Sequence, residues 1–183
     1  MAVRDIVLFA ENEAALRQKS KPVRTVNRRV KSLVRDLKDT LAHHPEGVGL
    51  AAPQIHIHRR VIVVRLGARC DSESEPCPPI ALINPEIVES GCEEKDFDGC
   101  LSLPGLYAET VRPHWLHVTG LDEWGQPFNR IFDGFDAVVV HHEIDHLNGV
   151  LFVDRVEDVE DLYQVQLDEK GSWVRVPVPA IGT

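Results

Sequence analysis

The chain has 183 residues, of which 43% are hydrophobic and 27% charged, values typical of one globular domain spanning residues 1–183. The formal net charge is −9 and no run of lysines and arginines is longer than a pair such as Arg28–Arg29, which argues against direct binding of nucleic acid or an anionic membrane surface. The apolar run Ile6–Ala10 is too short for a secretion signal, and no segment approaches the roughly 20 apolar residues of a membrane helix. We therefore expect a cytoplasmic protein.

The first predicted element is an amphipathic helix over Thr25–His43, because aliphatic residues recur there at helical spacing. Pro45 and Gly47 end this pattern. A buried strand is predicted at Arg59–Leu66, and a polar loop rich in proline at Ala68–Pro79.

The second half of the chain predicts further strands and one more helix. Ile80–Ser90 has the composition of a strand, and Leu116–Phe132 is predicted to form a hairpin that turns near Gly125. Phe135–Gly149 is assigned to a helix, and Trp173–Val178 to a last strand. Short strands around two helices indicate an α+β fold.

The helix at Phe135–Gly149 contains the motif H-E-x-x-H, formed by His142, Glu143 and His146. Residues four apart lie on one face of a helix, so both imidazoles can bind one metal ion while the glutamate stands beside them. A hydrolytic metal site usually has three protein ligands. The motif therefore leaves one ligand to be found.

The downstream sequence offers no distinct third ligand. Phe152 occupies the place of the third histidine in the extended motif H-E-x-x-H-x-x-G-x-x-H. A glutamate ligand would have to come from Glu157, Glu160 or Glu169, which lie in an acidic run that singles out none of them.

The best upstream candidate is Cys100, in the turn-like segment DGCLSLPG, because thiolates are strong ligands for zinc and iron(II). Taken alone, Cys100 is better explained as a buried, inert cysteine. We give this explanation to Cys70, Cys77 and Cys92 as well.

Three separated segments resemble, in order, the three signature motifs of the peptide deformylase family. They are GVGLAAPQ at Gly47–Gln54, DGCLS at Asp98–Ser102 and HEIDH at His142–His146. The flanking segments KPV, INPEIV and LNGVLF are also similar to that family, and the resemblance extends from about Ile6 to Val156. It implies an α+β fold in which short antiparallel or mixed sheets pack around a central helix that carries the two histidines.

The resemblance implies an enzyme that removes the N-formyl group from the N-terminal formyl-methionine of nascent proteins. It implies one divalent metal ion held by Cys100, His142 and His146, with Fe²⁺ as the native metal and Zn²⁺, Ni²⁺ or Co²⁺ able to occupy the site. A metal-bound water would attack the formyl carbon, and Glu143 would act as the general acid and base. The absence of a transit segment favours a bacterial copy over an organellar one.

The same resemblance assigns further roles. The Gln54 side chain and the backbone N–H of Leu101 would stabilise the oxyanion, and Gly49 would offer its backbone to the substrate peptide. An apolar slot for the methionine side chain would be lined by Val48, Val138 and Val139.

The sequence departs from the family pattern at three places. Asp98 stands where the family has glutamate, with Arg112 as the matching basic residue, and we expect weaker positioning of the cysteine loop with the metal retained. His141 replaces the usual glutamine but points about 100° away from His142, so it does not share the metal. The predicted strand Trp173–Val178 replaces a C-terminal helix. Its segment lacks the basic residues to grip ribosomal RNA, which leaves open whether the protein works close to the ribosome.

Other functions fit parts of the sequence. A small H-E-x-x-H metallopeptidase would take a downstream glutamate as ligand. A non-catalytic relative would bind peptide N-termini, with Asp98 marking decay of the site. A structural zinc site would need a fourth protein ligand, for which the sequence offers no candidate.

Overall fold

The computed structural model describes residues 2–67, 78–167 and 172–178. Cys70, Cys77 and Glu169 lie outside the described residues, as does most of the predicted loop Ala68–Pro79. Within the described residues, no helix is both long enough and apolar enough to span a membrane.

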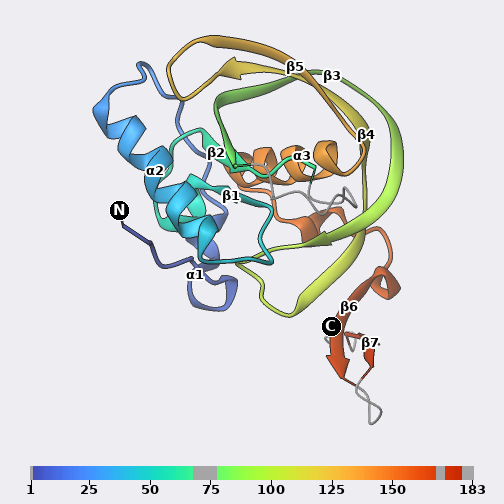
Figure 1. Ribbon diagram of the computed structural model, residues 1–183. Helices are drawn as coiled ribbons and strands as arrows, with labels where there is room; N and C mark the ends of the chain where they lie inside the picture. Colours follow the sequence, from blue (N-terminus) through green and yellow to red (C-terminus); the bar gives the residue numbers. More distant parts are fainter. Residues whose placement is uncertain (1, 68–77, 168–171, 179–183) are drawn as a thin grey trace.

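The helices are short and the strands form one curved sheet (Figure 1). The described residues contain three α-helices, α1 (Phe9–Leu16), α2 (Arg28–Ala42) and α3 (Phe135–Asn148), and three short 3-10 helices, η1 (Ala52–Ile55), η2 (Phe152–Arg155) and η3 (Val159–Asp161). The strands are β1 (Gly49–Ala51), β2 (Val61–Val64), β3 (Ile80–Gly99), β4 (Leu106–Leu121), β5 (Pro127–Asp133), β6 (Leu162–Leu167) and β7 (Trp173–Pro177).

Among the described residues, all seven strands belong to a single sheet with the order β1-β2-β3-β4-β6-β7, and β5 also pairs with β4. Every ladder between these strands is antiparallel. The α+β class is therefore confirmed, and of the two expected kinds of pairing the sheet has the antiparallel one. The expectation of short strands was wrong for β3, which has 20 residues, and for β4, which has 16.

The predicted helix at Thr25–His43 is confirmed as α2, but it starts three residues later. The Asn27 side chain accepts hydrogen bonds from the backbone N–H groups of Arg29 (3.0 Å) and Val30 (3.2 Å), and this capping sets the first turn. The apolar face of α2 packs on β1 and β2, where Leu37 and Leu41 are completely buried.

Strand β3 begins as predicted but continues well beyond Ser90 to Gly99, so that it delivers Asp98 to the site. The polar second half of β3 pairs residue by residue with β4, so it is held by backbone hydrogen bonds. Its side-chain pattern gives no sign of this pairing, which is why the sequence did not predict it. Cys92 is exposed with φ +57°, so the expectation of a buried cysteine was wrong there.

The hairpin of β4 and β5 is confirmed, with Gly125 in its turn at φ +87°. The last predicted strand is confirmed as β7. It pairs with β6, which the acidic composition did not predict, and the two form a hairpin that projects from the sheet (Figure 1).

Helix α3 contacts β1 to β5, and the long strands curve around it (Figure 1). All its residues from Ala137 to Leu147 are buried, since apolar side chains pack on the sheet while the polar ones contact each other. The helix ends at Gly149, which takes a left-handed conformation.

Replacing Gly149 with alanine is expected to lower the free energy of unfolding by about 1–3 kcal/mol. Its φ is +75°, and an added Cβ would lie 2.1 Å from the carbonyl oxygen of Arg17. Urea denaturation measures the loss. Gly105→Ala is the control, because Gly105 has a similar φ of +77° with open space around it, so it should cost less. Equal losses would mean that the contact with Arg17 has no effect.

Candidate active site

Three side chains of the types that bind metal ions come together from two distant segments. Cys100 follows the end of β3, while His142 and His146 project from α3. One donor atom from each lies within 4.8 Å of the other two, and Cys100 Sγ is 3.2 Å from His146 Nε2. One sulfur and two imidazole nitrogens at this spacing form a donor set that zinc or iron(II) accepts.

The orientation of His142 is set by Asp98. The Nδ1 of His142 lies 2.6 Å from Asp98 Oδ1, which leaves Nε2 as the nitrogen available to a metal. The second oxygen of Asp98 accepts hydrogen bonds from Thr110 Oγ1 (2.9 Å) and Arg112 Nε (2.7 Å). The shorter carboxylate at position 98 thus still reaches His142 and Arg112.

Arg112 is completely buried and joins Asp98 to α3. Its Nη1 donates to Asp145 Oδ2 at 2.8 Å, and Arg155 donates to the other oxygen of Asp145 at 2.7 Å. His141 lies 3.3 Å from Arg112 and from Arg155, on the side of this network rather than in the three-donor cluster. Burial lowers the pKa of His141 to about 4, so its ring is neutral at pH 7.

Electrostatics in the cluster favour a thiolate. Burial raises the pKa of the Cys100 thiol, but the imidazoles of His146 and His142 outweigh it and lower that pKa to about 5. Burial lowers the pKa of His142, yet the Asp98 carboxylate holds it well above its ordinary value. Metal binding requires the thiolate, and an ion bound at this cluster would have to displace the proton that the raised pKa leaves on His142.

Glu143 lies beside the cluster and is 4% exposed. Its Oε2 has no hydrogen-bond partner among the described residues, and burial raises the pKa of its carboxyl to about 7 although His142 and His146 oppose this. Gly49 packs directly against it, since an added Cβ would lie 2.4 Å from Glu143 Oε1. A buried carboxylate with an unused oxygen is suited to accept and return a proton.

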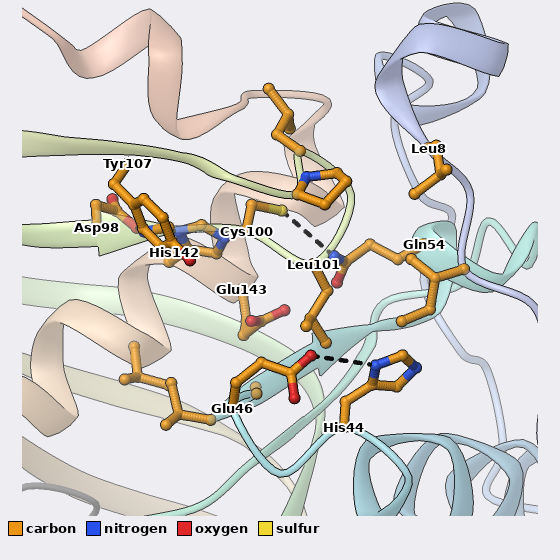
Figure 2. A pocket seen from close by; sticks show the side chains of 18 of the residues that line it. Leu8, His44, Glu46, Gln54, Asp98, Cys100, Leu101, Tyr107, His142 and Glu143 are labelled. Carbon is orange, nitrogen blue, oxygen red and sulfur yellow. Dashed lines mark hydrogen bonds and ion pairs between the residues drawn. The ribbon is translucent and has the colours of Figure 1, made fainter. Parts of the chain in front are cut away.

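The Gln54 amide is oriented by the backbone. Its Oε1 accepts a hydrogen bond from the N–H of Ala51 at 2.8 Å, so its Nε2 faces Cys100 Sγ (3.5 Å) and Ser102 Oγ (3.1 Å). Figure 2 shows Gln54, Cys100, His142 and Glu143 facing one space. The amide thus presents a fixed donor beside the cluster.

A cavity of about 1030 Å³ opens onto this cluster (Figure 2). Every residue predicted to bind substrate lines it, together with residues that the sequence did not point to. The predicted ones are Val48, Gly49, Val138 and Val139, with the backbone-donor residue Leu101. Those not predicted include Ile6, Leu8, Phe97, Leu103, Tyr107 and Phe135.

The N-terminal segment joins two walls of the cavity. The backbone N–H of Val7 donates to the carbonyl of Gln54, and that of Phe9 donates to the carbonyl of Ser102, both at 2.8 Å. No motif marks these positions, because only backbone groups act. The early apolar run is therefore part of the site's framework.

Two of the three downstream glutamates of the metallopeptidase alternative lie within the described residues, and neither joins the cluster. Glu157 and Glu160 are exposed, and the three-donor cluster found in the described residues contains neither. Phe152 is 1% exposed and stacks on the His142 ring with centroids 6.3 Å apart. The aromatic ring thus packs behind a candidate ligand in place of a third histidine.

Fold and site define a class of protein, in which an H-E-x-x-H helix and a cysteine loop share one candidate metal site. The polypeptide deformylase family model matches residues 3–161. Peptide deformylases of Thermomicrobium roseum (43% identity, covering 93% of this chain and 95% of the relative) and a Synechococcus species (42%, covering 87% and 77%) are similar to it. The crystal structure of a Legionella pneumophila peptide deformylase matches with a TM-score of 0.75 at 39% identity, covering 85% of this chain and 87% of that one. The chain belongs to the polypeptide deformylase family and is a hydrolase.

Proposed function

We propose that this protein removes the N-formyl group from the N-terminal formyl-methionine of nascent peptides. The observation that carries this proposal is the meeting of Cys100, His142 and His146 within 4.8 Å at a cavity whose lining is apolar in large part. A formyl-methionine end combines a small reactive carbonyl with an apolar side chain. The three-donor cluster suits the carbonyl, and the apolar part of the cavity lining suits the side chain.

One divalent metal would be held by the Cys100 thiolate, by His142 through Nε2 and by His146. The donor set fits Fe²⁺, Zn²⁺, Ni²⁺ or Co²⁺, and we propose Fe²⁺ as the native ion. When bound, the metal polarises a water molecule, so that a nucleophile is available near neutral pH. Asp98 orients His142 from behind, which keeps the ring in the tautomer that binds a metal.

Glu143 moves the proton. It takes a proton from the attacking water and passes it to the departing amine of methionine. Support for this role comes from its burial, its raised pKa of about 7 and its unpartnered Oε2. A carboxyl group with a pKa close to the working pH can both accept and donate a proton.

The developing negative charge on the formyl oxygen is stabilised by Gln54 Nε2 and by the backbone N–H of Leu101. The Ala51 N–H fixes the Gln54 amide, so this donor needs no reorganisation during the reaction. Gly49 presents its backbone to the peptide, and the apolar slot for methionine is lined by Val48, Val138 and Val139.

The test is release of formate from a formyl-methionyl tripeptide by protein purified without oxygen, with its metal content measured in the same sample. We expect turnover with about one metal ion per chain. The matched substrate is the acetyl-methionyl tripeptide, whose extra methyl group should sharply reduce cleavage. Metal retained after loading with Fe²⁺ or Ni²⁺, but no formate released, would overturn the proposal in favour of a non-catalytic relative that binds peptide N-termini.

Asp98→Asn is expected to weaken metal binding about 10–100-fold, because the amide no longer provides the carboxylate that orients His142. Competition with a chelator for Zn²⁺ measures the change. Glu89→Gln is the control, since it removes one charge from an exposed position of the same strand. An unchanged affinity in Asp98→Asn would mean that His142 is held in place without Asp98.

A further inference from the structure

The basic residues of this acidic chain are strongly concentrated. Nine of its 20 lysines and arginines fall within residues 17–38, where Asp36 is the only acidic residue. Other residues separate these lysines and arginines, so they form no long basic run. For this reason, and because the chain is acidic, the sequence argued against binding of nucleic acid. Helix α2 changes this argument, since positions three and four apart share a face.

Arg28, Lys31 and Arg35 line one groove of about 480 Å³ between α2 and the turn of the β4–β5 hairpin. All three side chains are exposed, and within the described residues none of them forms an ion pair. In Figure 1 the N-terminal part of α2 lies beside this turn, and Gly125 packs against Val26. We call these three residues and Trp124 the basic groove.

The carboxylates of the hairpin turn, and that of Asp36 on α2, are already engaged. Glu123, which also lines the groove, accepts both of its 3.0 Å hydrogen bonds from Lys38. Asp122 accepts from the backbone N–H groups of Trp124 and Gln126 in the turn, and Asp36 pairs with Arg4 at 2.7 Å. The positive charges of Arg28, Lys31 and Arg35 are thus left for an external partner.

Trp124 supplies a second kind of contact. It lies in the hairpin turn, lines the groove and is 68% exposed. Flat aromatic rings beside basic side chains bind unpaired bases by stacking, while the cations contact phosphates. Arginine contributes two of the three cations, and its planar group matches phosphate oxygens.

We propose that the basic groove binds single-stranded RNA, with Arg28, Lys31 and Arg35 on the phosphates and Trp124 stacked on a base. RNA is favoured over an anionic membrane because the aromatic ring lines a groove between charged side chains. The inference is independent of the reaction proposed above, since none of these residues lines the cavity at the cysteine and histidines.

The test is fluorescence anisotropy of a short labelled single-stranded RNA, titrated with the full-length protein over a range of potassium chloride concentrations. We expect salt-sensitive binding by the wild type. Arg28→Ala/Lys31→Ala should lower the affinity at least tenfold and reduce the slope of log affinity against log salt by about 1.4. Trp124→Leu should lower the affinity about tenfold with an unchanged slope, and Trp124→Phe should restore most of it.

The matched control is Lys95→Ala/Arg175→Ala, which also removes one lysine and one arginine, from exposed positions on β3 and β7. It should bind RNA like the wild type. Equal weakening by both double variants would overturn the proposal, because total charge would then explain the binding. Binding to phosphatidylglycerol vesicles without binding to RNA would also overturn it. All variants should hydrolyse the formylated tripeptide at the wild-type rate, so failure here is distinguishable from failure of the proposed reaction.

Discussion

Arg112→Met is expected to lower the free energy of unfolding by about 3–5 kcal/mol. The Arg112 side chain is completely buried, and it donates to Asp98 at 2.7 Å and to Asp145 at 2.8 Å. Without it, two buried carboxylates lose a shared counter-charge and keep one charged partner each, His142 for Asp98 and Arg155 for Asp145. Loss of charge compensation inside the protein is strongly unfavourable. Urea denaturation at a fixed metal concentration measures the loss, since bound metal itself stabilises the folded state.

Two variants decide whether the buried charges cause this loss. Arg4→Met breaks the pair with Asp36, but half of the Arg4 side chain is exposed, so it should cost less than about 1 kcal/mol. The double variant Arg112→Met/Asp98→Asn also removes the charge of one of the two carboxylates. Its free energy of unfolding should therefore be higher than that of Arg112→Met alone. A loss in Arg112→Met no larger than in Arg4→Met would contradict our account of the network.

Residue spacing alone predicted the part of the site that is local, whereas the distant part was predicted only through the resemblance to a family. His142 and His146 could be paired because a helix brings residues four apart together. Cys100 is 46 residues from His146, and only the resemblance to a family joined them before their 3.2 Å contact was known. The contact of Val7 with Gln54 could not be predicted from the sequence, because Val7 acts through a backbone N–H that any residue except proline provides.

The same division explains the fold. Helix α2 was predicted because its apolar face repeats at helical spacing, whereas the second half of β3 was missed because its side chains are mostly polar and exposed. Its hydrogen bonds come from pairing with β4, and such pairing depends on a partner strand rather than on side-chain pattern. Cys92 lies in this exposed half of β3, so the general tendency of free cysteines to be buried does not hold there.

Glu143→Gln is expected to reduce turnover of a formyl-methionyl tripeptide by about 10²–10⁴-fold while the metal content stays at the wild-type value. Glutamine preserves the size of the side chain, so the packing against Gly49 is kept. It cannot accept a proton from water or return one to the amine, and this loss falls on the chemical step. Formate release under single-turnover conditions, with metal measured on the same samples, separates proton transfer from metal binding.

Glu157→Gln and Cys100→Ser complete the experiment, because they distinguish the two ligand sets that the H-E-x-x-H motif allows. Glu157 is exposed and lies outside the three-donor cluster, so its variant should keep both metal and turnover. Cys100→Ser should lose affinity for zinc, since a serine hydroxyl is a poor ligand for that ion. The opposite pattern, with metal lost in Glu157→Gln and retained in Cys100→Ser, would favour a metallopeptidase. If Glu143→Gln turned over within tenfold of the wild-type rate, Glu143 would not be the group that transfers the proton.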